Sequence, residues 1–265
     1  MYKIGFIGGG KMAEAMIRSL LANKVADREG IICSDVLQDR RQALSRQFGI
    51  RLTESNLQVC RESEIIVLAF KPQGFPEVVK PLAQAVRADH IIISILAGIR
   101  IGAIRKYLPG RVIRVMPNTC CLVGEMAAGY TPAENVEPED LRLVKAILES
   151  AGLAIEVRED ELDAVTALSG SGPAFVAYLI ESFIQAGVAA GLSVSVARQL
   201  TLKTFAGTAR LLNETQMSAE DLIAMVSSPQ GTTVAGREIL ESSGMAETIE
   251  KTVKRAQQRS RELGQ

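Results

Sequence analysis

The chain has 265 residues, 47% of them hydrophobic and 23% charged, which suffices for one large globular domain or two small ones. Its 30 basic and 30 acidic residues balance and only 4% of residues are aromatic, so the composition argues against a nucleic-acid-binding protein. Residues 1–10 lack the basic start and cleavage site of a signal peptide, and no run of 18 apolar residues occurs. We therefore expect a cytoplasmic protein that does not bind membranes.

In chain order, the first half alternates short β-rich runs with helical patterns. Strands are predicted at 2–8, 30–35, 49–53, 64–70, 90–96 and 111–117, and helices at 11–22, 37–48, 74–87 and 100–107. The runs 65–69 and 91–95 are continuously apolar, as in strands that are covered on both faces. This alternation predicts a parallel, doubly wound sheet. A further pair of strands, at 126–131 and 152–158, flanks a helix at 138–151.

Beyond about residue 160 only helices are predicted, at 160–168, 173–191, 194–213, 218–226, 232–243 and 245–262. The predicted fold class is α/β, with an N-terminal doubly wound Rossmann domain at 1–160 and a C-terminal all-α dimerisation domain at 161–265. Helix 173–191 is apolar on nearly all sides, so most of its surface must be buried. We expect a subunit interface there; the alternative is the central helix of a monomeric bundle.

Cysteine and histidine are scarce in the chain. The four cysteines, at positions 33, 60, 120 and 121, form no C-x-x-C spacing, so we expect free thiols and no metal site. The one histidine, His90, precedes an apolar run and is interpreted as structural. A catalytic mechanism that depends on histidine is therefore not expected.

The segment "IGFIGGGKMAEAM" contains the pattern G-x-G-x-x-A, with Gly8, Gly10 and Ala13 at its fixed positions. It follows a predicted strand and opens a predicted helix, the context in which this pattern binds the pyrophosphate of a dinucleotide. Gly8 permits the tight turn, Gly10 lets the backbone approach the phosphates, and the start of the helix supplies N–H donors. We predict that Gly8, Gly10, Lys11 and Met12 bind the cofactor.

The end of the second predicted strand carries conflicting signals about that cofactor. Asp35 stands where an acidic residue accepts hydrogen bonds from the adenosine ribose of NADH. Arg40 and Arg41 follow within one turn of the next helix, where they are able to pair with the 2′-phosphate of NADPH. We predict that Asp35 binds the cofactor, and the choice between NADH and NADPH stays open.

Four loops have compositions suited to ligand binding. "FKPQ" at 70–73, "ILAG" at 95–98 and "MPNT" at 116–119 follow strands of the predicted sheet, where ligands gather at the carboxyl ends. The fourth loop, "SSPQGTTVAG" at 227–236, has no charged residue and runs into a predicted helix. Its hydroxyl groups and the free N–H groups of that helix predict a site for a small anion.

Taken in order, the segments "GFIGGGKMAEA", "VLAFKP", "SILAGI", "RVIRVMPNT", "ALSGSGPAFV" and "VSSPQGTTVAGREILE" resemble the motifs of pyrroline-5-carboxylate reductases. The resemblance covers essentially the whole chain, and the combination of "SGSGPA" with "SP-x-G-T-T" is specific. It implies a Rossmann domain followed by a helical domain that interlocks with a second subunit, and a substrate site at the dimer interface. It implies reduction of the cyclic imine L-1-pyrroline-5-carboxylate to L-proline by NADPH or NADH.

The resemblance also assigns roles to residues. The positions that line the cofactor in the family are matched by Gly8, Gly10, Lys71, Ala97 and Asn118, and those of the substrate loop by Ser228, Gly231, Thr232 and Thr233. The family uses backbone N–H groups of that loop for the substrate carboxylate and the hydroxyl of the second threonine for the ring nitrogen. Thr233 is therefore the predicted catalytic residue; its alternative role is a simple helix cap.

This sequence departs from the family pattern in four places. Gln230 stands where the family usually has glycine, and Cys120 replaces the proline that usually follows "MPNT". Residues 218–226 lack the usual His-Pro-Gly and Lys/Arg-Asp residues, and Asp35 suits a 2′-phosphate less than the Ser or Arg often found nearby. Two of these departures concern the substrate, and the one at Asp35 concerns the cofactor.

The scarcity of histidine is compatible with imine reduction, because a protonated imine is already electrophilic and needs mainly to be oriented. The sequence leaves two rival functions open. One is reduction of another cyclic imino acid or a β-hydroxyacid-type substrate; the other is a dinucleotide-binding sensor or scaffold without turnover. For partners we expect a small-molecule substrate and a homodimer through the C-terminal helices, with higher oligomers of dimers left open.

Overall fold

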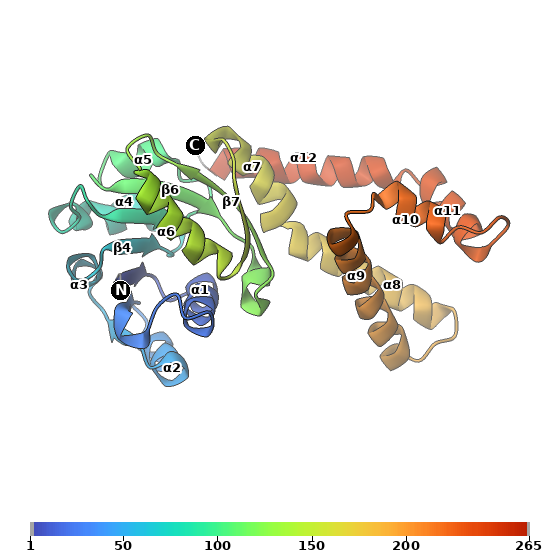
Figure 1. The fold of residues 1–265 in the computed structure, drawn as a ribbon, viewed down its shortest axis with the longest axis horizontal. Coiled ribbons are helices and arrows are strands. Elements are labelled where there is room, and N and C mark those ends of the chain that lie inside the picture. Colours follow the sequence, from blue (N-terminus) through green and yellow to red (C-terminus); the bar gives the residue numbers. More distant parts are fainter. Residues whose placement is uncertain (1–2, 264–265) are drawn as a thin grey trace. The chain divides into compact units, whose positions relative to one another are not determined.

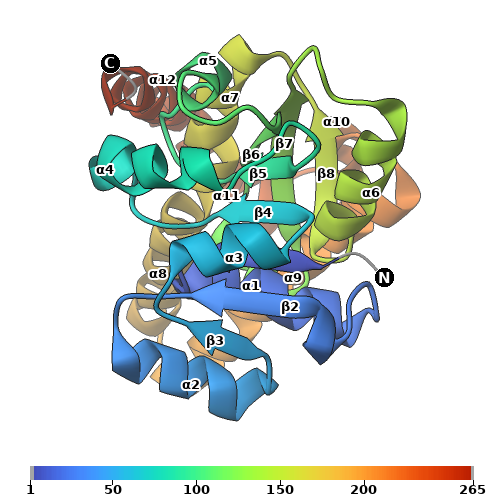
Figure 2. The same ribbon diagram turned by 90° about the vertical axis from the view of Figure 1, so that its left-hand side faces the viewer.

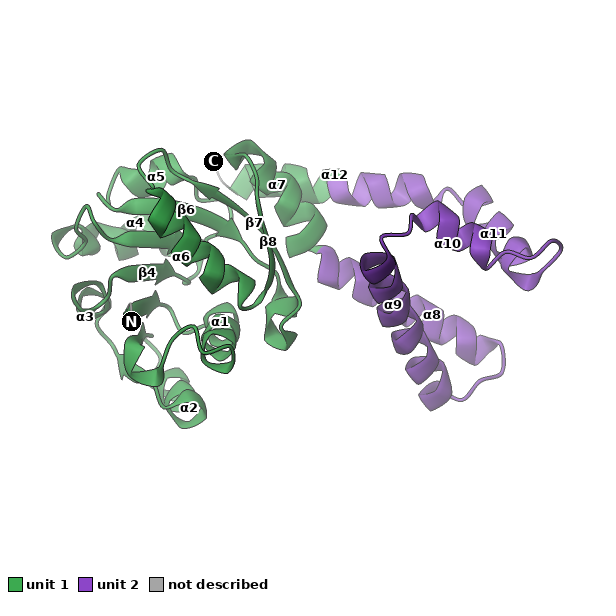
Figure 3. Cartoon of the chain, viewed as in Figure 1, with its two compact units in different colours: residues 1–171, 254–265 green, residues 172–253 purple. Residues whose placement is uncertain are grey.

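The structure is a computed structural model that describes residues 3–263. The chain divides into two compact units (Figure 3). Unit 1 takes in Met1–Ser171 and Lys254–Gln265, and unit 2 takes in Gly172–Val253. The two units are described separately below.

Unit 1 contains an eight-stranded sheet with the strand order β3-β2-β1-β4-β5-β6-β7-β8 (Figure 2). The strands are β1 (Ile4–Ile7), β2 (Ile31–Ser34), β3 (Arg51–Thr53), β4 (Ile65–Leu68), β5 (Ile91–Ser94), β6 (Arg111–Met116), β7 (Met126–Pro132) and β8 (Gly152–Glu156). All pairs from β3 to β6 are parallel, as the alternating sequence pattern predicts. β7 runs antiparallel to β6, because the short connection Pro117–Glu125 leaves no room for the helical crossover that a parallel pair needs.

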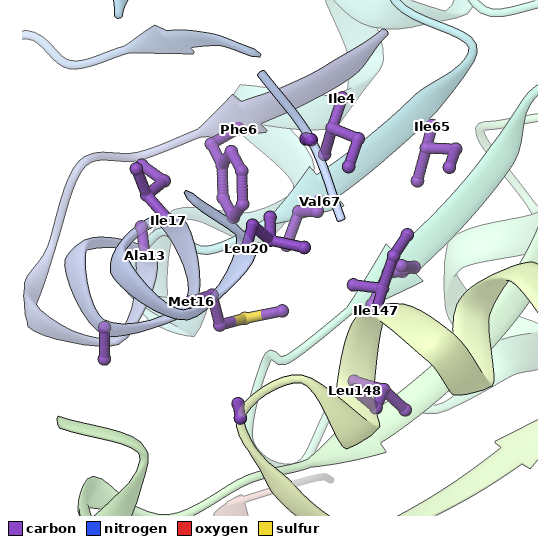
Figure 4. Packing of buried hydrophobic residues seen from close by; sticks show 14 of the residues in the cluster. Ile4, Phe6, Ala13, Met16, Ile17, Leu20, Ile65, Val67, Ile147 and Leu148 are labelled. Atoms are coloured by element: carbon purple, nitrogen blue, oxygen red, sulfur yellow. The ribbon is translucent and has the colours of Figure 1, made fainter. Parts of the chain in front are cut away.

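Helices cover both faces of this sheet (Figure 1). One face is covered by α1 (Lys11–Ala22), α2 (Gln38–Phe48) and α6 (Pro138–Glu149), and the other by α3 (Asn56–Glu62), α4 (Phe75–Val79) and α5 (Ile101–Arg105). Successive side chains of a strand therefore enter different cores: Val67 packs with α1, as Figure 4 shows, whereas Leu68 packs on the opposite face. Burial on both faces explains the unbroken apolar runs in the sequence.

Two elements of unit 1 differ from the prediction. The helix expected at 74–87 is broken into the 3₁₀ turn Pro72–Gly74, α4 and the 3₁₀ turn Lys80–Gln84, since the prolines in this stretch donate no backbone hydrogen bond. Helix α3 had no counterpart among the predicted helices. Its start is fixed by the Ser55 side chain, which accepts a hydrogen bond from the Gln58 N–H at 3.2 Å.

Unit 2 is entirely helical over its described residues. It contains α8 (Gly172–Ala189), α9 (Val194–Thr215), α10 (Ala219–Met225), α11 (Thr232–Ser242) and the first part of α12 (Met245–Leu263). α8 and α9 form a hairpin in which the rings of Phe183 and Phe205 meet edge to face, with centroids 5.3 Å apart. The last residues of α12 belong to unit 1, where Ser260 donates a hydrogen bond to the buried Asp163 at 2.7 Å.

The hairpin leaves large apolar side chains exposed within the single chain. On α8, Tyr178 is 75% exposed and Phe183 50% exposed, and only Ile184 is buried. By length and composition alone, the helical stretch Glu159–Ala189 would suffice to cross a membrane, with a mean hydropathy of 1.2 over 18 residues. Similar exposed apolar residues continue on the partly polar helices α9 and α10, a distribution typical of a surface that other protein covers.

Candidate active site

The carboxyl ends of the parallel strands meet at one edge of the sheet, and the strand order reverses between β1 and β4. Crevices at such a reversal are where doubly wound sheets bind dinucleotides. The structure places at this edge all of the cofactor residues predicted from the sequence. They follow β1 (Gly8, Gly10, Lys11, Met12), β2 (Asp35), β4 (Lys71), β5 (Ala97) and β6 (Asn118).

The glycine loop after β1 has the geometry of a phosphate cradle. Gly8 has φ +97°, and a Cβ atom there would lie 2.8 Å from the Ala69 carbonyl oxygen, so no larger residue fits. Gly10 is the N-cap of α1 and is exposed, and the nearest atom to a Cβ there would be 3.9 Å away. No side chain caps α1, so the N–H groups of its first turn, which begins at Lys11, remain available to an anion.

The Asp35 carboxylate is fixed at the edge of this loop. Its Oδ2 accepts a hydrogen bond from the Gly9 N–H and its Oδ1 one from the Leu37 N–H, both at 2.9 Å. Arg40 lies against the same loop and donates to the carbonyl oxygens of Gly9 and Gly10. The loop after β1 is thus held by an acid at the end of β2, Asp35, and by a base of α2, Arg40.

Both arginines of α2 are held by internal partners. Arg40 pairs with Glu14 of α1 at 2.6 Å, and Arg41 pairs with Glu54 and donates to the Asp35 carbonyl oxygen at 2.7 Å. Burial alone would raise the pKa of Glu14, but hydrogen bonds from Arg40 and Lys11 outweigh it and hold that pKa below its usual value. Glu14 therefore stays ionised and retains its guanidinium partner.

Asn118 is buried and its amide group joins three segments of unit 1. Its Oδ1 accepts from the Ala127 N–H at 3.2 Å, and its Nδ2 donates to the Ser169 hydroxyl at 3.1 Å. Ser169 lies in a π-helical turn, Thr166–Gly170, and donates in return to the Ala127 carbonyl at 2.6 Å. π-helical turns occur frequently at functional sites. The amide of Asn118 thus positions the end of β6, and Lys71 by contrast is exposed.

In unit 2, the loop 227–236 makes a tight turn into helix α11. The Gly231 N–H donates to the Ser228 carbonyl at 2.9 Å, and Gln230 has φ +58°. Proline at the second position and positive φ at the third define a type II turn, in which glycine is favoured at the third position. A Cβ on Gly231 would lie 2.4 Å from the Ser228 hydroxyl, so this close approach requires glycine.

Helix α11 begins with unpaired donors and free hydroxyl groups. Its N-cap is Gly231, which has no side chain to offer, so the N–H groups of Thr232 and Thr233 are uncapped. Both threonines are exposed, and within residues 3–263 the structure gives their hydroxyls no hydrogen-bond partner. The alternative role of Thr233 as a simple N-cap is therefore wrong, since that position belongs to Gly231.

One polar group near this loop was missed from the sequence. The hydroxyl oxygen of Ser227 is buried and lacks a hydrogen-bond partner within the described residues. A buried hydroxyl without a partner is energetically unfavourable unless a ligand or water completes it. Its position next to Ser228 in the sequence was the only available signal, because burial is not visible in a short polar loop.

The histidine and the four cysteines lie outside the predicted binding loops. His90 is fully buried at the amino end of β5, the edge opposite the glycine loop, and its Nδ1 accepts from the Arg87 N–H at 3.1 Å. Burial lowers the pKa of His90, which keeps the imidazole neutral. All four cysteines are free thiols, as expected, and burial raises the pKa of Cys33 to about 12.

The φ of Gln230 gives a stability prediction for the substrate loop. Replacing Gln230 with glycine should raise the free energy of unfolding by about 0.5–1 kcal/mol, because the relief of the left-handed conformation exceeds the entropy that glycine adds to the unfolded chain. Denaturant unfolding at fixed protein concentration measures this. Gln230→Ala is the control, since alanine keeps the strain; a glycine variant less stable than the alanine variant would refute the explanation.

Known proteins resemble this chain over both of its predicted regions. A family model described as pyrroline-5-carboxylate reductase dimerisation matches residues 159–263, and one described as NADP oxidoreductase coenzyme F420-dependent matches residues 3–98. A pyrroline-5-carboxylate reductase of Methanosarcina acetivorans is 39% identical over 264 residues, which cover 99% of this chain and 98% of the relative.

Solved structures agree over the full length. A pyrroline-5-carboxylate reductase from Coxiella burnetii superposes with a TM-score of 0.94 at 33% identity, covering 100% of this chain and 99% of that one. A pyrroline carboxylate reductase from Plasmodium falciparum, solved with NADP bound, gives a TM-score of 0.90 at 30% identity, covering 100% and 98%.

Proposed function

The chain belongs to the pyrroline-5-carboxylate reductase family, and we propose from this premise how its own residues carry out the family's reaction. The enzyme reduces L-1-pyrroline-5-carboxylate to L-proline with NADH or NADPH. The observation that carries this function is similarity over the whole length of both chains, with Gly8 and Gly10 of the glycine loop and Gly231 and Thr233 of the loop before α11 all present. The rival functions, a different substrate or a sensor without turnover, are not favoured.

Two regions of the chain are proposed to have different roles. Residues 1–160 are proposed to bind the dinucleotide and residues 161–265 to bind the substrate and a second subunit. The match of residues 159–263 to a dimerisation model makes the protein a homo-oligomer through its C-terminal region. We also propose that the dimers assemble further, that the protein is cytoplasmic, and that it has no membrane or nucleic-acid partner.

The cofactor residues act by holding and orienting. The dinucleotide, when bound, supplies a hydride. Gly8 and Gly10 keep the loop open to its phosphates, and the N–H groups at Lys11 and Met12 donate to them. Asp35 accepts from the ribose, Lys71 and Ala97 line the nicotinamide half, and Asn118 sets the end of β6 beside it.

The loop before α11 is proposed to hold the substrate by its carboxylate. The uncapped N–H groups of Thr232 and Thr233 and the positive end of the helix attract this anion, and the Ser228 hydroxyl donates a further hydrogen bond. Gly231 brings Ser228 close to the start of the helix. The buried hydroxyl of Ser227 offers one more polar contact next to this group.

Thr233 is proposed to orient the ring nitrogen. In the reactive form this nitrogen carries a proton, which makes the adjacent ring carbon electrophilic. The N–H of the ring nitrogen donates a hydrogen bond to the Thr233 hydroxyl oxygen. Addition of a hydride to that carbon leaves the nitrogen with its proton and gives the amine of proline, so no residue has to supply a proton in the same step. The site therefore needs to hold the reacting carbon about 3–3.5 Å from the hydride donor, and it does not need a histidine base.

The function is tested by mixing the purified protein with pyrroline-5-carboxylate and either NADH or NADPH. We expect loss of the reduced-nicotinamide absorbance and formation of proline. Binding of either cofactor without turnover of this substrate would contradict the reductase function and favour a dinucleotide-binding sensor instead.

The oligomer is tested at the exposed apolar face of α8. Tyr178→Ala should weaken subunit association about tenfold or more, because a large exposed aromatic side chain in an interface often contributes about 2 kcal/mol. Light scattering over a dilution series measures this. Lys145→Glu, at an exposed charged position of α6 in unit 1, is the control and should leave association unchanged. Equal association of the two variants would place the interface elsewhere.

A further inference from the structure

The contacts around Asp35 bear on which dinucleotide the glycine loop accepts. Two N–H groups, from Gly9 and Leu37, each hold one oxygen of the carboxylate at 2.9 Å. A carboxylate offers about four acceptor positions, so both oxygens retain a free one. We propose that Asp35 makes this enzyme select NADH over NADPH, an inference that rests on the proposed function.

The side chains that would otherwise bind a 2′-phosphate are already engaged. Arg40 donates to the carbonyls of Gly9 and Gly10 and pairs with the buried Glu14. Arg41 is bound to Glu54 and to the carbonyl oxygens of Asp35 and Val36. Their side chains are only 20% and 14% exposed, respectively. To turn toward a phosphate, Arg40 would have to give up its pair with the buried Glu14, whereas Glu54, the partner of Arg41, is 76% exposed and holds Arg41 less firmly.

The remaining charge near Asp35 opposes a phosphate too. A 2′-phosphate brings about two negative charges at neutral pH. The Asp35 carboxylate cannot turn away from it without losing its hydrogen bonds to the Gly9 and Leu37 N–H groups. The start of α2 attracts anions, but its first turn carries Asp39, which counters that attraction. A ribose with a free 2′-OH meets no such conflict, because it donates to the carboxylate.

Direct binding tests the proposal without relying on turnover. The dissociation constants of NADH and NADPH are measured from reduced-nicotinamide fluorescence, and those of NAD⁺ and NADP⁺ by calorimetry. We expect the wild-type protein to bind NADH and NAD⁺ at least tenfold more tightly than their 2′-phosphorylated counterparts. Equal affinity, or tighter binding of NADPH, would overturn the proposal.

Variants separate the charge of Asp35 from the shape of the loop. Asp35→Asn removes the charge and should lower the NADPH/NADH ratio of dissociation constants about tenfold. Glu14→Gln should lower it as well, because it releases Arg40. The control, Asp27→Asn, removes an exposed carboxylate before the amino end of β2, away from the glycine loop, and should change the ratio by no more than about twofold.

Thermal unfolding of each variant checks that it is folded. A ratio that does not respond to Asp35→Asn in a folded protein contradicts the role of Asp35. Kinetics with pyrroline-5-carboxylate keep the two proposals apart: turnover with a preference for NADPH would refute this inference and leave the function standing. Tight NADH binding without turnover would refute the proposed function and leave the cofactor preference standing.

Discussion

Replacing Gly8 with alanine should weaken dinucleotide binding by about 100-fold or more and lower the free energy of unfolding by about 2–4 kcal/mol. The backbone at Gly8 has φ +97°, which residues with a side chain adopt only with strain, and the new Cβ would lie 2.8 Å from the Ala69 carbonyl oxygen. Relief of that overlap moves the loop after β1 away from β4. The N–H groups at the start of α1 then no longer converge on the phosphates.

Gly10→Ala is the matched control, because it separates folding from binding. Gly10 has φ −65°, and its Cβ would meet no atom closer than 3.9 Å. We expect the free energy of unfolding of this variant to lie within about 1 kcal/mol of the wild-type value, because the weaker helix cap and the lower entropy of the unfolded chain offset each other. Its dinucleotide affinity should still fall at least tenfold, because the methyl group occupies the open face of the loop.

Calorimetric titration with NAD⁺ and NADP⁺, together with thermal unfolding, measures both effects. If Gly8→Ala binds the dinucleotide normally, the loop does not form the phosphate site. If Gly10→Ala loses as much stability as Gly8→Ala, the difference in φ between these two glycines has no energetic meaning and the explanation fails.

The sheet and its glycine loop were predictable from local patterns. The run around Ile65 and Val67 is apolar because both of its faces are covered, and that signal needs no knowledge of distant residues. Likewise, the spacing of Gly8 and Gly10 after a strand carries its own geometry. The antiparallel placement of β7 and the short helix α3 were not predicted, because a strand pattern does not encode direction and a seven-residue helix has little periodicity.

The candidate site was harder to predict where it depends on contacts between distant segments. Arg40 suggested a 2′-phosphate partner from the sequence, yet it pairs with Glu14, a residue 26 positions away on another helix. In the same way, Asn118 is held by Ser169 across 51 positions. Gln230 departs from the family pattern at a position whose positive φ, seen only in the structure, explains why glycine is favoured there.

Replacing Thr233 with alanine should lower kcat/KM for pyrroline-5-carboxylate about 10–100-fold, equivalent to about 1.4–2.7 kcal/mol. The hydroxyl is proposed to accept a hydrogen bond from the protonated ring nitrogen, and bonds to charged groups are typically in this range. Stability should change little, because Thr233 lies in the first turn of α11 behind the N-cap Gly231. A loss of activity without a loss of stability would therefore report on the substrate.

Two neighbouring variants decide what the hydroxyl does. Thr233→Ser keeps it and should retain most of the activity, whereas Thr233→Val keeps the shape and should fall with Thr233→Ala. Thr232→Ala removes the adjacent exposed hydroxyl and should cost less than about threefold, since only the backbone N–H of Thr232 is assigned to the carboxylate. Wild-type kinetics in Thr233→Val would show that the side chain only fills space. The ring nitrogen would then need another partner, for which the buried, unpartnered hydroxyl of Ser227 is a candidate.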